Sequence, residues 1–182
     1  VWGSHVLPID TSVYNFITKH FISDTLTPIM RVITQFGGTI LMIVWAIASL
    51  VLITNKRIAV SVVSNLVLIA LLNNILKLIV RRARPTGFRL VEETGYSFPS
   101  GHSMVSMAFY GYLIYLIYKN VKNKKLRWTL MTGFGILIFI IGMSRIYLGV
   151  HYTSDVFAGF LFSLGYLVVY IKMTDPIVFQ KK

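Results

Sequence analysis

The sequence predicts an all-α protein, a polytopic membrane helix bundle formed as a single domain over residues 1–182. Three observations predict this fold. Of the 182 residues, 55% are hydrophobic and only 13% are charged, whereas a soluble domain carries about 25% charged residues. The mean hydropathy is +0.71. Five separate segments each hold roughly 20 mainly apolar residues, which is the length of helix that crosses a bilayer.

The first predicted span runs from about Pro28 to Ile53. Thr27 is expected to cap it, with Pro28 at the first helical position, where a missing N–H is harmless. The four later spans are expected at about residues 58–80, 100–118, 126–147 and 152–172.

Residues 11–22 differ from these spans because their apolar side chains recur at helical spacing among polar residues. The pattern predicts a short helix that lies in the membrane interface, with an ordinary surface helix as the alternative. Residues 1–27 would then form an interfacial, extracytoplasmic lead-in to the first span.

The net charge of +12 raises the question of nucleic acid binding. Here the basic residues lie between apolar runs, as in membrane proteins, so no nucleic acid partner is expected. The 119–127 loop carries five basic residues, which places it in the cytoplasm by the positive-inside rule. Loops 81–99 and 145–152 would then face outward together. Residues 1–27 would also lie outside, which suggests that a sixth, N-terminal span is missing from this chain.

The first cluster of candidate functional residues is Lys77, Arg84 and Pro85, with six residues between the two basic side chains. A separation of seven residues is about two helical turns, so Lys77 and Arg84 are expected to share a face. Asn73 and Lys77 inside an apolar span are costly unless they face a polar cavity. The alternative is that the basic run only anchors the helix in the interface, and this is the interpretation that we prefer for Arg81 and Arg82.

The second cluster is Ser97-Phe98-Pro99-Ser100-Gly101-His102-Ser103. Ser100 is a suitable N-cap for the third span, and the free N–H groups of a helix's first turn form an anion site. Gly101 lets the backbone approach a ligand closely, and His102 stands beside that site. Taken alone, a histidine at this position is more often structural than functional.

The third cluster is Ser144-Arg145, followed by His151 after five residues and by Asp155 after three more. His151 and Asp155 lie four residues apart, so they share one face at a helix start. A carboxylate there can hold one imidazole nitrogen and aim the other outward. A structural hydrogen bond or half of a metal site is the alternative.

Together the clusters indicate phosphoryl transfer, because cations and N–H donors stabilise the phosphoryl oxygens while a nucleophile and an acid complete the reaction. The carboxylates are too few and too scattered for a two-metal site. We therefore expect no metal and no cofactor. Glu92 and Glu93 are interpreted as a solvated loop.

The three clusters resemble the signature of the type 2 phosphatidic acid phosphatase superfamily, K-x6-R-P, P-S-G-H and S-R-x5-H-x3-D, over about residues 27–172. The resemblance implies that His151 is a nucleophile forming a phosphohistidine, that Asp155 orients it, and that His102 is the general acid and base. It also implies a phosphate-binding set, which comprises Lys77, Arg84, Ser100, Gly101 and Arg145.

The resemblance further implies a metal-independent lipid phosphatase of the bacterial cell membrane. Its active site would face the extracytoplasmic side, and its substrate would be a polyprenyl diphosphate or phosphatidylglycerol phosphate held in the bilayer among membrane lipids. The alternatives are a phosphatidic acid phosphatase of broad specificity, a non-catalytic lipid-phosphate binding protein, and a vanadium haloperoxidase relative.

Overall fold

The computed structural model describes residues 6–179, in which helices are the only regular secondary structure, as the sequence predicts. Residues 1–5 and 180–182 lie outside the described part, and with them two basic residues, Lys181 and Lys182. The helices are α1 (Pro8–His20), α2 (Leu26–Gln35), α3 (Thr39–Leu52), α4 (Lys56–Val80), α5 (Gly101–Asn120), α6 (Lys124–Tyr147) and α7 (Thr153–Val178).

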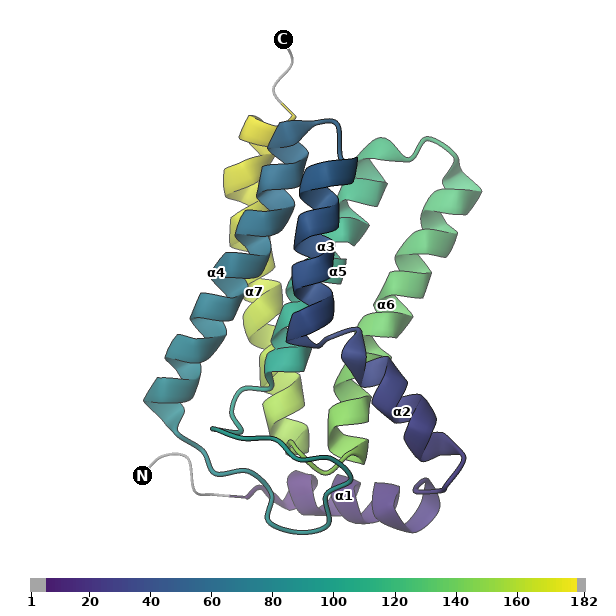
Figure 1. The fold of residues 1–182 in the computed structure, drawn as a ribbon, viewed down its shortest axis with the longest axis vertical. Helices are drawn as coiled ribbons and strands as arrows, with labels where there is room; N and C mark the ends of the chain where they lie inside the picture. The colour runs from purple at the N-terminus through teal and green to yellow at the C-terminus, as the bar shows by residue number, and fades with distance from the viewer. Residues whose placement is uncertain (1–5, 180–182) are drawn as a thin grey trace.

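The bundle is formed by α3 to α7, which run along its long axis, while α1 lies across one end (Figure 1). Helix α5 is central and packs against α4, α6 and α7. Large apolar side chains on the outer helices point away from the bundle, among them Ile40, Val51 and Leu161. This is the reverse of a water-soluble protein and matches a bilayer environment.

Among residues 6–179, three helices are long and apolar enough to cross a membrane, namely α4, α6 and α7. The pair α2 and α3 makes a fourth if it counts as one broken span. Helix α5 is not among them, because its histidine, serine and tyrosine residues lower its mean hydropathy below that of the other three. The predicted number of five spans, or six with a missing helix, is therefore not confirmed.

The predicted single span from Pro28 to Ile53 is wrong in one respect, because the chain breaks between α2 and α3 with a bend of 43°. A Cβ on Gly37 would lie 2.8 Å from Ile141 and 3.3 Å from His102. The glycine therefore lets the break pass close to α5 and α6. An apolar run that continues through the glycines hid this break.

The start of the first helix also differs from the prediction. Helix α2 begins at Leu26, so Thr27 is inside it and does not cap it. The N-cap position is Thr25, whose side chain makes no capping hydrogen bond. The hydroxyl of Ser23 accepts a hydrogen bond from the Leu26 N–H at 3.2 Å instead. The Thr27 hydroxyl instead donates to the Ser23 carbonyl at 2.8 Å.

The other boundaries lie near their predicted positions, although α7 continues to Val178, beyond the predicted end near residue 172. The predicted short helix at residues 11–22 is present as α1. The loop after α4 and the connection from α6 to α7 lie at the same end of the bundle as α1 (Figure 1). All three sequence clusters therefore meet at one end.

Candidate active site

The end of α4 supplies the first basic groups of the site. Arg81 adopts a left-handed conformation (φ 50°) and ends the helix, so Arg84 lies in the following loop. The expected shared helical face of Lys77 and Arg84 is therefore wrong. The two side chains nevertheless line one cavity, together with Asn73, because the loop folds back over the helix end. The Lys77 ammonium donates to the Tyr96 carbonyl at 2.5 Å.

Arg84 is held firmly by backbone carbonyls. Its guanidinium donates to Thr94 at 2.9 Å, to Gly95 at 3.1 Å and to Val150 at 3.0 Å. The same group lies 3.2 Å from Nε2 of His151. Arg84 is thus a pre-oriented cation beside the imidazole, as an anion-binding group requires.

The start of α5 forms the second wall. Ser100 is its N-cap, as predicted, and its buried hydroxyl accepts a hydrogen bond from the Ser103 hydroxyl at 3.0 Å. A Cβ on Gly101 would lie 3.1 Å from Oδ1 of Asn73, so the glycine allows α4 and α5 to approach closely. Gly101 and His102 both line the cavity that Lys77 and Arg84 line.

His151 is buried in the connection between α6 and α7. Because Arg84 has only donors, the Nε2 atom that faces it must accept, so Nε2 carries a lone pair and Nδ1 carries the proton. Nδ1 lies 3.4 Å from the Ser97 hydroxyl and 3.6 Å from Oδ2 of Asp155. This tautomer presents Nε2 as a nucleophile.

Burial lowers the pKa of His151 to about 4, with Asp155 opposing the shift and the Arg145 and Arg84 charges reinforcing it. The imidazole is therefore neutral at physiological pH. A neutral imidazole has the free electron pair that attack on phosphorus requires.

Ser97 joins the two members of this pair, and the sequence interpretation gave it no role. Its hydroxyl donates to Oδ2 of Asp155 at 2.5 Å and faces Nδ1 of His151. The Tyr152 N–H also donates to Oδ2, at 2.9 Å. Nothing in the sequence around Ser97 indicates a contact with His151 and Asp155, because a serine two residues before a proline belongs to no recognisable motif.

Arg82 is not an interfacial anchor, which corrects the sequence interpretation. It is buried and bonds Oδ1 of Asp155 at 2.6 Å and Oδ2 of Asp10 at 2.8 Å. Its guanidinium also lies 4.2 Å from the centre of the Tyr152 ring. The left-handed turn at Arg81 directs the chain inward here, and no periodic pattern announces such a turn.

Glu93 is not simply part of a solvated loop, which is a second correction. Its carboxylate forms an ion pair with Arg145, and its other oxygen lies 3.8 Å from the Arg84 guanidinium. Arg145 is buried, donates to the Thr34 hydroxyl at 2.6 Å, and keeps an Nε that has no hydrogen-bond partner among residues 6–179. A carboxylate thus sits between the two arginines expected to bind phosphate.

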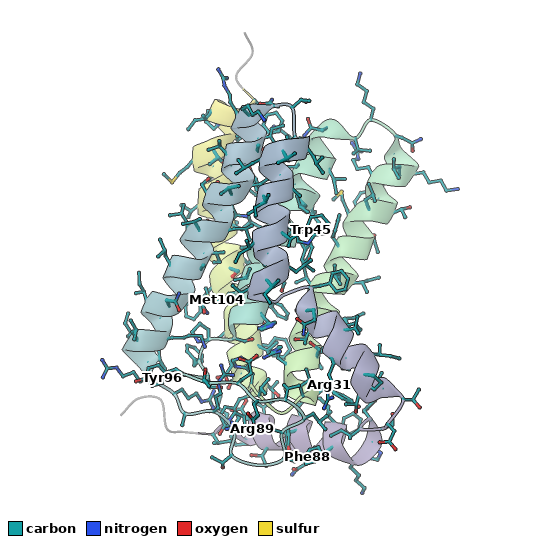
Figure 2. All side chains as sticks on the ribbon, viewed as in Figure 1. Arg31, Trp45, Phe88, Arg89, Tyr96 and Met104 are labelled. Carbon is teal, nitrogen blue, oxygen red and sulfur yellow. The ribbon has the colours of Figure 1, made fainter. Side chains whose placement is uncertain are left out.

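A cavity of about 650 Å³ connects these groups to the bundle interior. Its polar end is formed by Lys77, Arg84, Glu93, His102 and His151. Its remaining wall comes from apolar residues of α3 and α4, such as Met42, Ala46, Val63, Leu66 and Ala70. Arg89, by contrast, lies with Phe88 at the edge of the molecule near α1 (Figure 2) and is not a lining residue.

Across residues 6–179, no group of three or more histidine, aspartate or glutamate side chains is arranged to hold a metal ion. The anion-binding groups of the cavity are arginine, lysine and backbone N–H. The arrangement can bind a phosphoryl group and present a histidine nitrogen to it.

Several known proteins are similar to this chain in sequence. Over 105 residues the chain is 40% identical to phosphatidylglycerophosphatase B of Bacillus subtilis, which covers 56% of this chain and 49% of that protein. The match thus spans about half the length of that relative. The chain is 27% identical over 186 residues to undecaprenyl-diphosphatase of Sulfolobus acidocaldarius, covering 97% of this chain and 85% of the relative.

Solved structures agree. The crystal structure of a transmembrane PAP2 type phosphatidylglycerolphosphate phosphatase from Bacillus subtilis is similar with a TM-score of 0.80 and 26% identity, covering 96% of this chain and 90% of that one. The Aquifex aeolicus LpxE structure shares the fold, with a TM-score of 0.68 at 19% identity over 91% of this chain and 96% of that one.

Together with the long apolar helices, these similarities make the chain a multi-pass membrane protein. The profile of the PAP2 superfamily matches residues 58–178. That segment makes up most of the chain and contains all three clusters of the site, from Lys77 to Asp155. This protein therefore belongs to the PAP2 superfamily.

Proposed function

We propose that this protein is a membrane lipid-phosphate phosphatase that hydrolyses a lipid phosphomonoester or diphosphate through a phosphohistidine. One observation carries the proposal: the cavity is cationic where it reaches Nε2 of His151 and apolar along α3 and α4. An amphiphile fits this division, with its phosphate at His151 and its chain between the helices. A soluble phosphate ester would leave the apolar wall uncovered.

In the first step Nε2 of His151 attacks the phosphorus, and the bond from phosphorus to the lipid oxygen breaks. His102 gives its proton to that oxygen, so the lipid leaves as an alcohol or, from a diphosphate, as a monophosphate. Asp155 stabilises the positive charge that develops on the imidazole. Lys77 and Arg84 stabilise the phosphoryl oxygens, helped by Ser100 and the Gly101 N–H. Arg145 does not line the cavity and pairs with Glu93, so it joins them once the phosphate has displaced the Glu93 carboxylate.

In the second step water attacks the phosphohistidine, and the nitrogen–phosphorus bond breaks. His102, now neutral, takes the proton from that water. Inorganic phosphate leaves and His151 returns to its neutral form. The two steps need no redox partner and no metal ion, so we expect activity to survive EDTA, and vanadate to inhibit as a trigonal mimic of the phosphoryl group.

The substrate proposal follows the relatives, which are named for phosphatidylglycerol phosphate and undecaprenyl diphosphate. The diphosphate is a separate candidate because the match to undecaprenyl-diphosphatase covers 97% of this chain. The second phosphate of a diphosphate is not assigned to Arg82 or Arg89, because Arg82 is paired with Asp10 and Asp155 and neither side chain lines the cavity.

Phosphate release from purified protein in detergent tests the function. The panel comprises phosphatidic acid, phosphatidylglycerol phosphate, and polyprenyl mono- and diphosphates, with His151→Gln as the inactive control. Release from at least one lipid, lost in the control, is the expected result. A protein that is folded yet releases phosphate from none of them would leave only binding without catalysis. We further propose that the site faces the extracytoplasmic side of the cell membrane.

A further inference from the structure

A chain of buried charges links the first helix to the candidate catalytic carboxylate. Asp10 of α1 pairs with Arg82 at 2.8 Å, and Arg82 pairs with Oδ1 of Asp155 at 2.6 Å. All three side chains are buried. Buried charges are tolerated only when they are paired and hydrogen-bonded. The three groups therefore depend on one another.

Asp10 also reaches the helix that carries Asp155. Its carboxylate accepts hydrogen bonds from the Ser154 N–H at 2.8 Å and from the Ser154 hydroxyl at 2.9 Å. The N–H groups in the first turn of a helix lack partners within that helix. Asp10 thus supplies a cap to α7 from α1, one residue before Asp155.

The charges of this chain decide how Asp155 acts on His151. Arg82 alone would neutralise Asp155 and weaken its attraction for a positive imidazole. Asp10 compensates Arg82, so that the three groups together carry a net charge of about −1 next to His151. Asp155 then retains an uncompensated charge, and its Oδ2 side stays available to Ser97 and His151.

We propose that Asp10 and Arg82 are positioning residues of the catalytic centre, which set the orientation and the effective charge of Asp155. They act through Asp155 and do not line the main cavity. The proposal extends the histidine–aspartate pair into a four-residue line, His151, Asp155, Arg82 and Asp10. It rests on the proposed phosphatase reaction, in which His151 becomes positively charged during attack.

Three variants separate a charge effect from a loss of structure. Asp10→Asn leaves the network near neutral, Arg82→Gln leaves it near −2, and the double variant restores about −1. Three quantities are measured for each variant: kcat, KM and the pKa of His151. The pKa is measured by NMR of nitrogen-labelled histidine in detergent. The other charged or titratable groups near His151 are Arg84 from the loop, Arg145 from α6 and His102 from α5, and none of these is altered.

For Asp10→Asn we expect kcat to fall on the order of 10-fold to 100-fold, as for residues that orient a functional ligand, with KM nearly unchanged. The pKa of His151 should fall in Asp10→Asn, rise in Arg82→Gln and return towards the unaltered value in the double variant. The double variant should also recover part of the kcat lost in Asp10→Asn.

Asp24→Asn is the matched control, because Asp24 is an exposed carboxylate at the same end of the molecule. If Asp10 and Arg82 had purely structural roles, kcat of the double variant would be no higher than that of either single variant. The pKa of His151 would also be the same in all variants, and that result would overturn the proposal. If Arg82→Gln does not fold, Arg82→Lys keeps the charge and should hold the His151 titration in place. If the unaltered protein released no phosphate from any lipid, the proposed function would be refuted instead. The NMR titration of His151 would still test whether Asp10 and Arg82 set the charge beside it.

Discussion

Replacing Glu93 by glutamine tests whether the anion site is held by an internal carboxylate before substrate binds. Glu93 lines the cavity and pairs with Arg145, which does not itself line it. A phosphate that uses both Arg84 and Arg145 must therefore displace the Glu93 carboxylate. The apparent affinity for any such anion is therefore the intrinsic affinity multiplied by the fraction of molecules in which Glu93 does not occupy the site.

The size of the effect follows from the contact. A hydrogen bond to a charged group contributes about 1.5–3 kcal/mol. The Glu93 side chain is 31% exposed while that of Arg145 is 2% exposed, so solvent screening lowers the contribution to about 1–2 kcal/mol. At 1.4 kcal/mol for each factor of ten, Glu93→Gln should tighten anion binding about 5-fold to 30-fold.

The assay is competitive inhibition by inorganic phosphate and by vanadate, measured as Ki in the unaltered protein and in the variant. Glu93→Asp keeps the charge but shortens the side chain, so it should also tighten binding if displacement is the cause. Glu92→Gln removes a charge from the exposed neighbouring residue and should leave Ki nearly unchanged. An equal or weaker affinity for phosphate in Glu93→Gln would refute the reasoning.

Three further predictions follow from the site. His151→Ala should abolish phosphate release with the fold intact, and Arg145→Ala should lower kcat/KM on the order of 10²–10³-fold, as for one transition-state donor; phosphate trapped on another residue would contradict the first. Because the pKa of His151 is about 4 when folded and about 6.5 when unfolded, the unfolded state binds more protons between these values, so Tm in detergent should fall as pH falls from about 6.5 to 4. His151→Gln should reduce that fall. Cysteines introduced at Asn123 and Glu92 should show opposite access to an impermeant thiol reagent in intact cells, with Glu92 labelled; the reverse pattern would invert the membrane orientation.

The sequence predicts those residues of the site that belong to one of the three spaced motifs. Lys77, His102 and His151 line one cavity because three short patterns end at helix termini, and helix termini are readable from caps and prolines. Arg82 and Glu93 could not be assigned in this way. A charged residue in a polar loop looks the same in sequence whether it faces water or an ion partner, and only tertiary packing decides between them.

The break between α2 and α3 was missed for a related reason. Apolar residues continue on both sides of Gly37, and hydropathy averaged over a span cannot register a bend of 43°. The glycine signals a close approach only when its neighbours are known, here Ile141 and His102. Likewise, the end of α4 depends on the left-handed turn at Arg81, a conformation that arginine seldom adopts.

The contact of Asp10 with Ser154 joins residues 144 positions apart in the chain. During synthesis, Asp10 leaves the ribosome long before Ser154 and Asp155 exist to receive it. On the proposed mechanism, a partly inserted chain holds its cationic loop and α5 without the pair of His151 and Asp155. Hydrolysis would then require α7 to have entered the bilayer and packed against α1, so we expect chains truncated before α7 to release no phosphate from lipids.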